Sequence, residues 1–311
     1  MRSRIVLLTG RRRGAVLLDR LLQSGFPVVG CIVMEEDSHE ERWEERITAV
    51  AARSGIECLV AKTLNSGPAA EWLRCWNPRI VVAENWRTLI PPRVFEPVDH
   101  FVVLHESLLP HYRGFAPLSW PIINGESHTG VTLFYIAEEV DSGDVIDQRT
   151  LPIEPDDTVN DLYERTICAY WDVLQRNLPL LEENLAPRRA QDHTRATYGC
   201  TRTPEDGRIP WEAPSAMIYN LARGLAPPLM PGAWTTYRGQ RLTVCAARPL
   251  KSPPAYTGRI PGRVVKVCDA AVWVLTGDGV MVLETIRPGD AATAPLAASA
   301  VIRSIRATLG G

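Results

Sequence analysis

The sequence has no long apolar run and no paired cysteine motif. Its apolar stretches fall short of the ~18 to 20 residues that cross a membrane, and residues 1–10 lack the three-part pattern of a secretory signal. We therefore expect a soluble, cytoplasmic protein without a membrane partner. The seven cysteines are scattered, with neither a C-x-x-C pair nor a histidine spacing typical of zinc. They predict reduced thiols packed in the core and no metal site.

The chain also lacks an excess of positive charge and a dinucleotide-binding motif. A formal net charge of -2 and a pI of about 6.3 argue against a nucleic-acid partner, so a small metabolite is the better prediction. The loop at residues 10–14 reads G-R-R-R-G, without the G-x-G-x-x-G spacing that admits a pyrophosphate, which argues against NAD. Arg11 and Arg13 either clamp a substrate phosphate or carboxylate or belong to a solvated basic loop.

The apolar content is sufficient for two packed cores. The chain has 311 residues, 45% of them apolar, which exceeds one typical domain. β-branched runs alternate with helical stretches in the first part, which predicts an α/β fold with a Rossmann-like parallel sheet over residues 1–190. The predicted strands are 4–8, 27–33, 58–61, 80–83, 101–105 and 130–136. A helix is predicted from Asp157 to about Asn177, and Pro179 begins a polar stretch.

The last third of the sequence has a different pattern. Residues 191–205 predict a linker, and residues 206–311 predict a small OB-like β-barrel, because short alternating runs are punctuated there by Gly and Pro. A helical patch at 214–225 precedes these runs. The predicted strands are 233–237, 242–246, 262–268, 272–275 and 280–286.

Two residues in the first domain are candidates for acid/base chemistry. His105 ends a predicted strand, where catalytic residues of α/β sheets lie, and its imidazole can accept or donate a proton near neutral pH. Asp141 follows the strand candidate 130–136 in a Gly-containing turn. If that strand lies parallel and adjacent, Asp141 reaches the same sheet edge and orients His105 or a water. The alternative is that residues 141–143 only form a turn.

The sequence around these two residues is distinctive. HESLLPHYRGFAP, together with EEVDSGDVI, resembles the folate-dependent formyltransferase family, which includes methionyl-tRNA, glycinamide ribonucleotide and sugar N-formyltransferases. RTPEDGRIPW, IYNLARGL and PGAW resemble the start of the second domain of the tRNA and sugar enzymes. The resemblance implies 10-formyltetrahydrofolate as the formyl donor, His105 as acid/base, and Asp141 as support for proton transfer to the leaving folate nitrogen.

The resemblance also implies roles for two sets of neighbouring residues. Those that shape the catalytic loop are Ser107, Leu108, Pro110, Tyr112, Arg113 and Gly114. Those that form the pterin pocket are Trp86, Leu89, Ile90, Ala137, Glu138 and Val140, although Trp86 can equally be a core residue.

One catalytic position departs from the family pattern. The family has an asparagine two residues before the histidine, where it donates a hydrogen bond to the tetrahedral oxyanion, and this chain has Val103. Loss of one oxyanion donor typically lowers the rate by on the order of 10²-fold or more. Three explanations stay open: another donor, such as protonated His105, Asn85 or a water, has taken over; the transferred group is formimidoyl, from formimidoyltetrahydrofolate; or the chain is an impaired folate-binding relative.

The acceptor is predicted from charge and length. Residues 35–46 carry seven acidic side chains against two arginines, which repels phosphate and disfavours initiator tRNA, so methionyl-tRNA formyl transfer is an alternative only. The glycinamide ribonucleotide enzyme has a single domain, so the second domain here favours an amino sugar or an antibiotic intermediate. In the sugar enzymes Arg202 would lie near the nucleotide, with Arg11 and Arg13 near its diphosphate. Glu106 can instead pair with a cationic amine acceptor.

Overall fold

The computed structural model describes residues 3–36, 42–289 and 293–310, and the chain forms two compact units. Unit 1 consists of Met1–Pro117, Thr129–Pro152 and Glu164–Gly199, and unit 2 of Leu118–His128, Ile153–Tyr163 and Cys200–Gly311. Within the described ranges, no helix is both long and apolar enough to span a bilayer. The predicted division of the chain at residues 191–205 stays a prediction.

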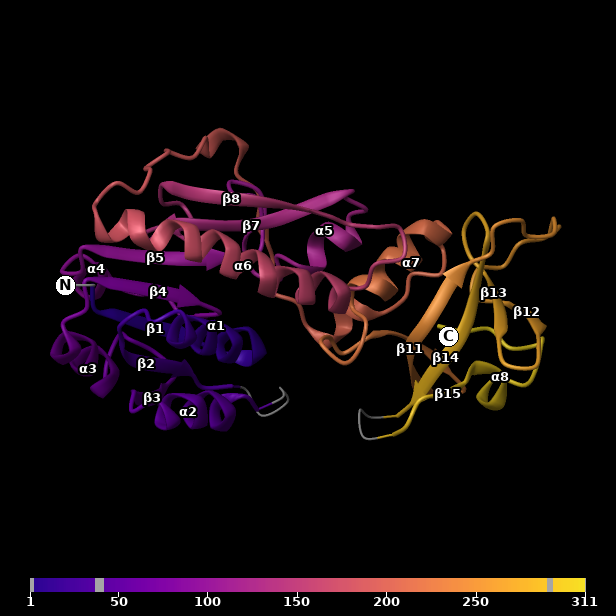
Figure 1. The fold of residues 1–311 in the computed structure, drawn as a ribbon. Helices are drawn as coiled ribbons and strands as arrows, with labels where there is room; N and C mark the ends of the chain where they lie inside the picture. Colours follow the sequence, from indigo (N-terminus) through magenta and orange to yellow (C-terminus); the bar gives the residue numbers. More distant parts are fainter. Residues whose placement is uncertain (1–2, 37–41, 290–292, 311) are drawn as a thin grey trace. The chain divides into compact units, whose positions relative to one another are not determined.

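Unit 1 is built on a seven-stranded sheet in the order β3-β2-β1-β4-β5-β7-β8 (Figure 1). Its strands are β1 (Ile5–Thr9), β2 (Val28–Met34), β3 (Glu57–Ala61), β4 (Ile80–Glu84), β5 (His100–His105), β7 (His128–Tyr135) and β8 (Val145–Pro152). The first five strands are parallel, which confirms the predicted Rossmann-like α/β fold. The chain order reverses between β1 and β4, where ligands of open α/β sheets bind.

Two features of this sheet differ from the sequence prediction. Strand β7 runs antiparallel to β5, with His105 opposite Thr132, because the connection between them carries only the five-residue α5 (Ser119–Ile123) instead of a long crossover helix. Strand β8 was not predicted, since its second half is polar and partly exposed. Asp141 therefore reaches His105 through the β7–β8 connection and not from a shared carboxyl edge.

Side chains alternate between the two faces of the sheet. Val6, Val81 and Phe101 pack with α3 (Pro68–Trp76) on one face, and Thr9 and Glu84 point to the other. Gly30 is required on the α3 face, because a Cβ there would lie 2.4 Å from the Trp76 ring. By the same alternation along β5, Val103 and His105 belong to the α3 face, whereas the following residue points away from it.

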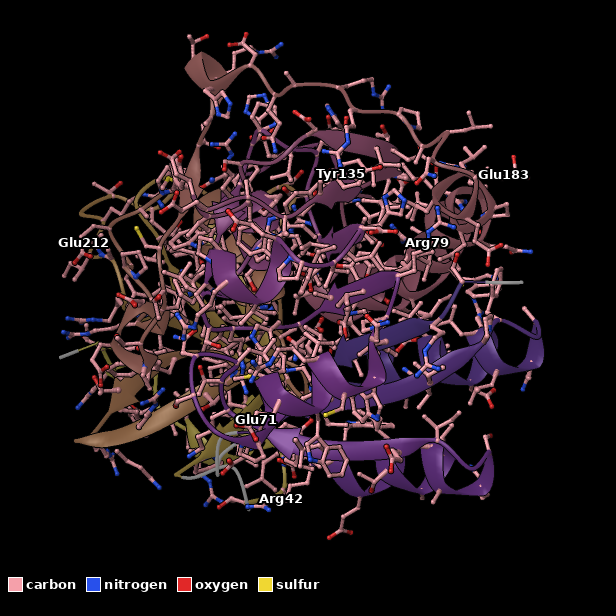
Figure 2. The ribbon with its side chains drawn as sticks, turned by 90° about the vertical axis from the view of Figure 1, so that its left-hand side faces the viewer. Arg42, Glu71, Arg79, Tyr135, Glu183 and Glu212 are labelled. Atoms are coloured by element: carbon pink, nitrogen blue, oxygen red, sulfur yellow. The ribbon has the colours of Figure 1, made fainter. Side chains whose placement is uncertain are left out.

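The opposite face is covered by α1 (Arg11–Gln23) and α6 (Val159–Glu182). Arg20 of α1 stacks on Trp171 of α6, and the Tyr170 hydroxyl donates to the Leu104 carbonyl of β5. Helix α6 continues through Pro179, where the sequence had predicted its end. Beyond Pro179, Arg79 donates to the Glu182 carbonyl at 2.8 Å, and Figure 2 shows Arg79 beside Glu183. The remaining helices of unit 1 are α2 (Glu44–Arg53) and α4 (Pro92–Phe95).

A small two-stranded sheet joins the loop that follows β5, residues 106–118 and called the catalytic loop below, to the segment after α6. Its strands are β6 (Arg113–Gly114) and β9 (Tyr198–Gly199), which pair in parallel. All seven cysteines are free, but only Cys31 is buried, and Cys75, Cys168 and Cys200 are exposed. The prediction of seven core thiols is therefore wrong, since scattered cysteines give no burial pattern of their own.

Unit 2 contains an antiparallel sheet in the order β10-β11-β14-β13-β12, with β15 beside β14. Its strands are β10 (Ala233–Tyr237), β11 (Gln240–Pro249), β12 (Val264–Val267), β13 (Val272–Leu275), β14 (Val280–Pro288) and β15 (Leu296–Ala297). Its helices are α5, α7 (Ser215–Gly224) and α8 (Ala298–Val301). Trp211 is buried in the core of this unit and donates to Thr235 at 3.0 Å. The predicted second domain of short β-strands is confirmed, and its strands form an antiparallel sheet.

Candidate active site

His105 and Asp141 are brought together, as the sequence predicted. The His105 side chain is largely buried at the end of β5, and its Nδ1 lies 3.6 Å from Asp141 Oδ2. On the other side of the ring, Nε2 lies 2.8 Å from the Tyr112 carbonyl oxygen. Both ring nitrogens thus face oxygen acceptors, so the imidazole can hold a proton on either side. The 3.6 Å separation is longer than a hydrogen bond, and such gaps commonly close when substrate binds.

The turn that carries Asp141 is constrained on several sides. Asp141 has a φ of +50°, which is uncommon for a residue other than glycine, and its Oδ2 accepts from Gly114 N at 2.7 Å. Two residues on, a Cβ at Gly143 would lie 1.8 Å from the Tyr135 carbonyl oxygen. Gly143 is therefore needed for close approach of two backbones. The turn is a fixed element and not a loose connection.

The first part of the catalytic loop is anchored on Thr132 of β7. Thr132 Oγ1 donates to the Ser107 carbonyl at 2.6 Å and accepts from Leu109 N at 3.1 Å. The buried Ser107 hydroxyl donates to the His111 carbonyl at 2.6 Å. Leu108 packs closely on Gly130, because a Cβ built on Gly130 would lie only 2.4 Å from the Leu108 side chain.

The second part of the loop is held by the segment around Thr197. Thr197 N donates to the Pro110 carbonyl at 3.2 Å, and its hydroxyl accepts from Tyr112 N at 2.8 Å. Arg113 is fully buried, and Gly114 has a φ of +84°, which favours glycine. All six residues predicted to shape the loop therefore lie in one connected segment beside His105.

Behind the loop, on the α1 and α6 face, lies a buried ionic cluster. Arg13 donates to Glu84 at 2.9 Å, forms an ion pair with Glu106, and bonds Thr166 of α6. Glu84 is fully buried and also accepts from Thr9 at 2.8 Å. Two carboxylates thus share one guanidinium. Glu106 meets Arg13, whereas the sequence had suggested a cationic acceptor.

The two carboxyl groups of this cluster differ in their pKa. Burial raises the pKa of Glu84 above its ordinary value, and the nearby Arg13 offsets only part of that rise. Burial also opposes ionisation of Glu106, but Arg13 and then His105 outweigh it and lower the pKa of Glu106. Glu106 is therefore the carboxyl that stays ionised next to His105.

The other predicted arginine contacts lie elsewhere. The Arg11 backbone N–H donates to Glu36 at 3.3 Å, and the neighbouring Arg12 forms an ion pair with Glu164. Arg202 belongs to unit 2, where it donates to the Asp206 carbonyl at 2.8 Å and its guanidinium lies 4.7 Å from the centre of the Trp120 ring.

Val103 and Asn85 bear on the missing oxyanion donor. Val103 lies between Ala83 of β4 and Phe134 of β7 and offers no donor. Asn85 Nδ2 is buried and has no acceptor within the described ranges. A Cβ built on Gly10 would lie only 2.7 Å from this Nδ2 atom. Asn85 therefore lies on the side of β4 that faces β1. His105 lies on the opposite, β5 side.

The residues predicted to line the pterin pocket come from two segments that share the α3-face cluster. Trp86 and Ile90 pack against the same cluster as Ile136, which immediately precedes Ala137. Leu89 and Val140 are exposed apolar side chains, and Glu138 is also exposed. Trp86 Nε1 is buried without a partner in the described part of the chain.

The chain thus combines a Rossmann-like sheet, with His105 beside Asp141 at the end of a central strand, and an antiparallel second unit. Residues 4–176 match the formyl transferase family, and residues 202–304 match the formyl transferase C-terminal domain. The chain belongs to the formyl transferase family, whose members use a tetrahydrofolate co-substrate. The predicted enzyme class is confirmed.

Individual relatives agree with this assignment. The chain is 32% identical to methionyl-tRNA formyltransferase of Syntrophus aciditrophicus (strain SB), over 87% of this chain and 86% of the relative. It is 35% identical to that of Moorella thermoacetica (strain ATCC 39073 / JCM 9320), over 78% and 76%.

Solved structures share the fold. WlaRD, a sugar 3N-formyl transferase solved with dTDP and 5-N-formyl-THF, has a TM-score of 0.68 at 18% identity, over 91% of this chain and 98% of its own. HypX from Aquifex aeolicus in complex with tetrahydrofolic acid has a TM-score of 0.66 at 20% identity, over 98% of this chain. This chain spans 48% of the length of HypX.

Proposed function

We propose that this chain transfers the formyl group of 10-formyltetrahydrofolate to the amine of a small acceptor, such as an amino sugar or an antibiotic intermediate. The observation that supports this most is the His105–Asp141 pair, with 3.6 Å between Nδ1 and Oδ2 at the carboxyl end of β5. A histidine beside a carboxylate is a suitable general base, because the carboxylate stabilises the imidazolium that forms.

The proposed reaction proceeds in two steps. The acceptor nitrogen attacks the formyl carbon and forms a new C–N bond, the π bond of the formyl C=O opens to an oxyanion, and His105 accepts the proton that the amine releases. The tetrahedral intermediate then collapses, the bond between the formyl carbon and folate N10 breaks, and His105 returns the proton to N10. The products are the formamide of the acceptor and tetrahydrofolate. Asp141 stabilises the charge on His105 between the two steps.

We assign the folate to the wall formed by Trp86, Leu89, Ile90 and residues 137–140. The exposed Leu89 and Val140 offer apolar surface for the ring system. Because Val140 adjoins Asp141, which lies beside His105, we expect the formyl group on N10 of this folate to lie near His105.

The charges at the start of α1 favour an acceptor without phosphate at that position. A helix N-terminus ordinarily attracts anions. Here Gly10 N and Arg11 N donate to Glu84 and Glu36, at 3.5 and 3.3 Å, so the chain's own carboxylates occupy that position. Arg13 is likewise paired internally, and a substrate diphosphate would have to displace Glu84 and Glu106 from it.

Three alternative functions each have an observation in their favour. Val103 favours formimidoyl transfer, because an attacked C=N carbon develops an amine nitrogen and needs no oxyanion donor. Initiator tRNA is favoured by the curated relatives, which are methionyl-tRNA formyltransferases. Val103 is also consistent with an impaired relative that binds folate without turnover.

One experiment separates these functions. The protein is incubated with 10-formyltetrahydrofolate and a panel of amino sugars, aminoglycosides, polyamines and initiator methionyl-tRNA, and acceptor masses are then measured. Formyl gain on a small amine that is lost in His105→Ala supports the proposal, whereas gain on the tRNA alone contradicts the acceptor class. Gain only with formimidoyltetrahydrofolate identifies the second function, and folate binding without gain from either donor identifies the impaired relative.

A further inference from the structure

The segment that follows α6 lies against the candidate active site. This segment, residues 183–199, is called the strap below. Arg189 of the strap pairs with Val145 at the start of β8, and its last two residues form β9, which pairs with β6 of the catalytic loop. Between these two attachments lies Gln191, which is 7% exposed.

The Gln191 side chain uses its whole hydrogen-bonding capacity. Its Nε2 donates to the carbonyl oxygens of Asp141 and Gly143, at 2.9 and 2.7 Å. Its Oε1 accepts from Arg113 Nη2 at 2.7 Å and from Arg113 Nε at 3.2 Å. Only this amide orientation fits, because a flipped amide would place NH₂ against a guanidinium and oxygen against two carbonyls.

These bonds complete a ring around Asp141. The Asp141 carboxylate accepts from Gly114 N at 2.7 Å, and the adjacent Arg113 holds Gln191, which holds the Asp141 backbone. Arg113 is itself fixed by His193 Nδ1 and the Tyr198 hydroxyl of the strap, each at 3.1 Å. The turn around Asp141 is therefore attached to the catalytic loop at two points, one through its carboxylate and one through its backbone.

The backbone conformation of Asp141 explains why the turn needs such a brace. Asp141 has a positive φ, a conformation that persists only when its surroundings hold it. A displacement of about 1 Å at a catalytic group can cost about 10²-fold in rate. The carboxylate must also keep its orientation while the charge on His105 changes.

We propose that Gln191 is a positioning residue, which holds the Asp141 carboxylate toward His105 by joining the Asp141 turn to Arg113. The inference rests on the proposed function for its effect on turnover, but the brace itself can be measured without turnover. Gln191 touches neither substrate nor reacting atoms in this account, and it acts through Asp141.

Two substitutions separate the halves of the brace. Gln191→Glu keeps the shape and the acceptor for Arg113, but it loses both donors and places oxygen against two carbonyls. Gln191→Leu removes both halves. Gln175→Glu, on the exposed side of α6, is the matched control for the same chemical change.

The kinetic test uses the full chain with an amine that it formylates. Gln191→Glu should lower kcat by about 10-fold or more, because the Asp141 carboxylate is no longer held toward His105. In an Asp141→Asn background the same substitution should have no further effect on kcat. Unchanged kcat, or effects that multiply in the double variant, would overturn the proposal.

The structural test needs no acceptor. Amide hydrogen exchange at Gly114, whose N–H is bonded by Asp141, is followed by NMR on protein labelled with ¹⁵N-glycine. Exchange should become at least about 10-fold faster in Gln191→Leu and stay unchanged in Gln175→Glu, since loss of the brace frees the turn. Unaltered protection of Gly114 would refute the brace even if the wild-type enzyme transferred no formyl group, which separates its failure from that of the proposed function.

Discussion

Replacing Arg13 with methionine should leave one buried and one partly buried carboxylate without their shared cation. Glu84 is fully buried and Glu106 has a side-chain exposure of 17%. Removing one partner of a buried ion pair costs about 3–5 kcal/mol. For a unit of this size each kcal/mol lowers the unfolding midpoint by about 2–4 °C, so the midpoint should fall by roughly 6–20 °C at pH 7.5.

The loss of stability should also depend on pH. A carboxyl whose folded-state pKa is raised contributes most below its unfolded pKa, and that contribution is lost as the pH rises toward the folded value. Burial already raises the pKa of Glu84, and loss of Arg13 removes a lowering influence on both carboxyls. The deficit against wild type should shrink toward pH 5, by at most about 1.4 kcal/mol per pH unit for each proton bound.

The assay is thermal unfolding of wild type and Arg13→Met at pH 5 and pH 7.5, followed by circular dichroism. The matched control is Arg12→Met, which removes an exposed ion pair with Glu164 and should cost less than about 1 kcal/mol. A deficit for Arg13→Met that equals the control, or one that does not change with pH, would refute the assignment of a shared buried cation.

Three further predictions concern the reaction centre. In steady-state kinetics, His105→Ala and Asp141→Asn should each lower kcat by about 10²-fold or more, because general acid/base groups contribute that much. The circular dichroism spectrum of both variants should stay native. Full activity in either variant would reject the acid/base roles. Val103→Asn should speed formyl transfer if an oxyanion forms, and unchanged rates in the same assay would favour formimidoyl transfer. Gly143→Ala should abolish activity, since its Cβ has no room beside a backbone carbonyl, whereas Ser142→Ala, whose hydroxyl is exposed, should retain it.

The sequence predicted those parts of the site that depend on local patterns. A β-branched run ending at His105 predicted both the strand and the residue at its carboxyl end, and the Gly-containing turn after residue 136 predicted the place of Asp141. The direction of β7 could not be read, because side chains alternate between the two sheet faces in parallel and antiparallel strands alike, and β7 is buried along nearly its whole length. Strand β8 was missed because half of it is polar.

Long-range partners were beyond sequence reasoning. Arg13 and Glu84 are 71 residues apart, and Gln191 lies 50 residues from Asp141 and 78 from Arg113. No periodicity or motif joins such positions, so Glu106 was interpreted as an open acceptor contact and residues 191–205 as a plain linker. Burial of a polar or charged side chain is the signal that could have identified these long-range partners, and this burial exists only in the folded chain.

Formyl transfer from folate to an amine is tested most directly by following the transferred carbon itself. Wild-type protein is mixed with 10-formyltetrahydrofolate labelled with ¹³C in the formyl group and with a small amine acceptor, and the label is observed by NMR. The label should leave folate N10 and appear as a formamide of the acceptor, and His105→Ala and Asp141→Asn should suppress this transfer. Label that stays on the folate, or that is released only as formate, would contradict formyl transfer to an amine.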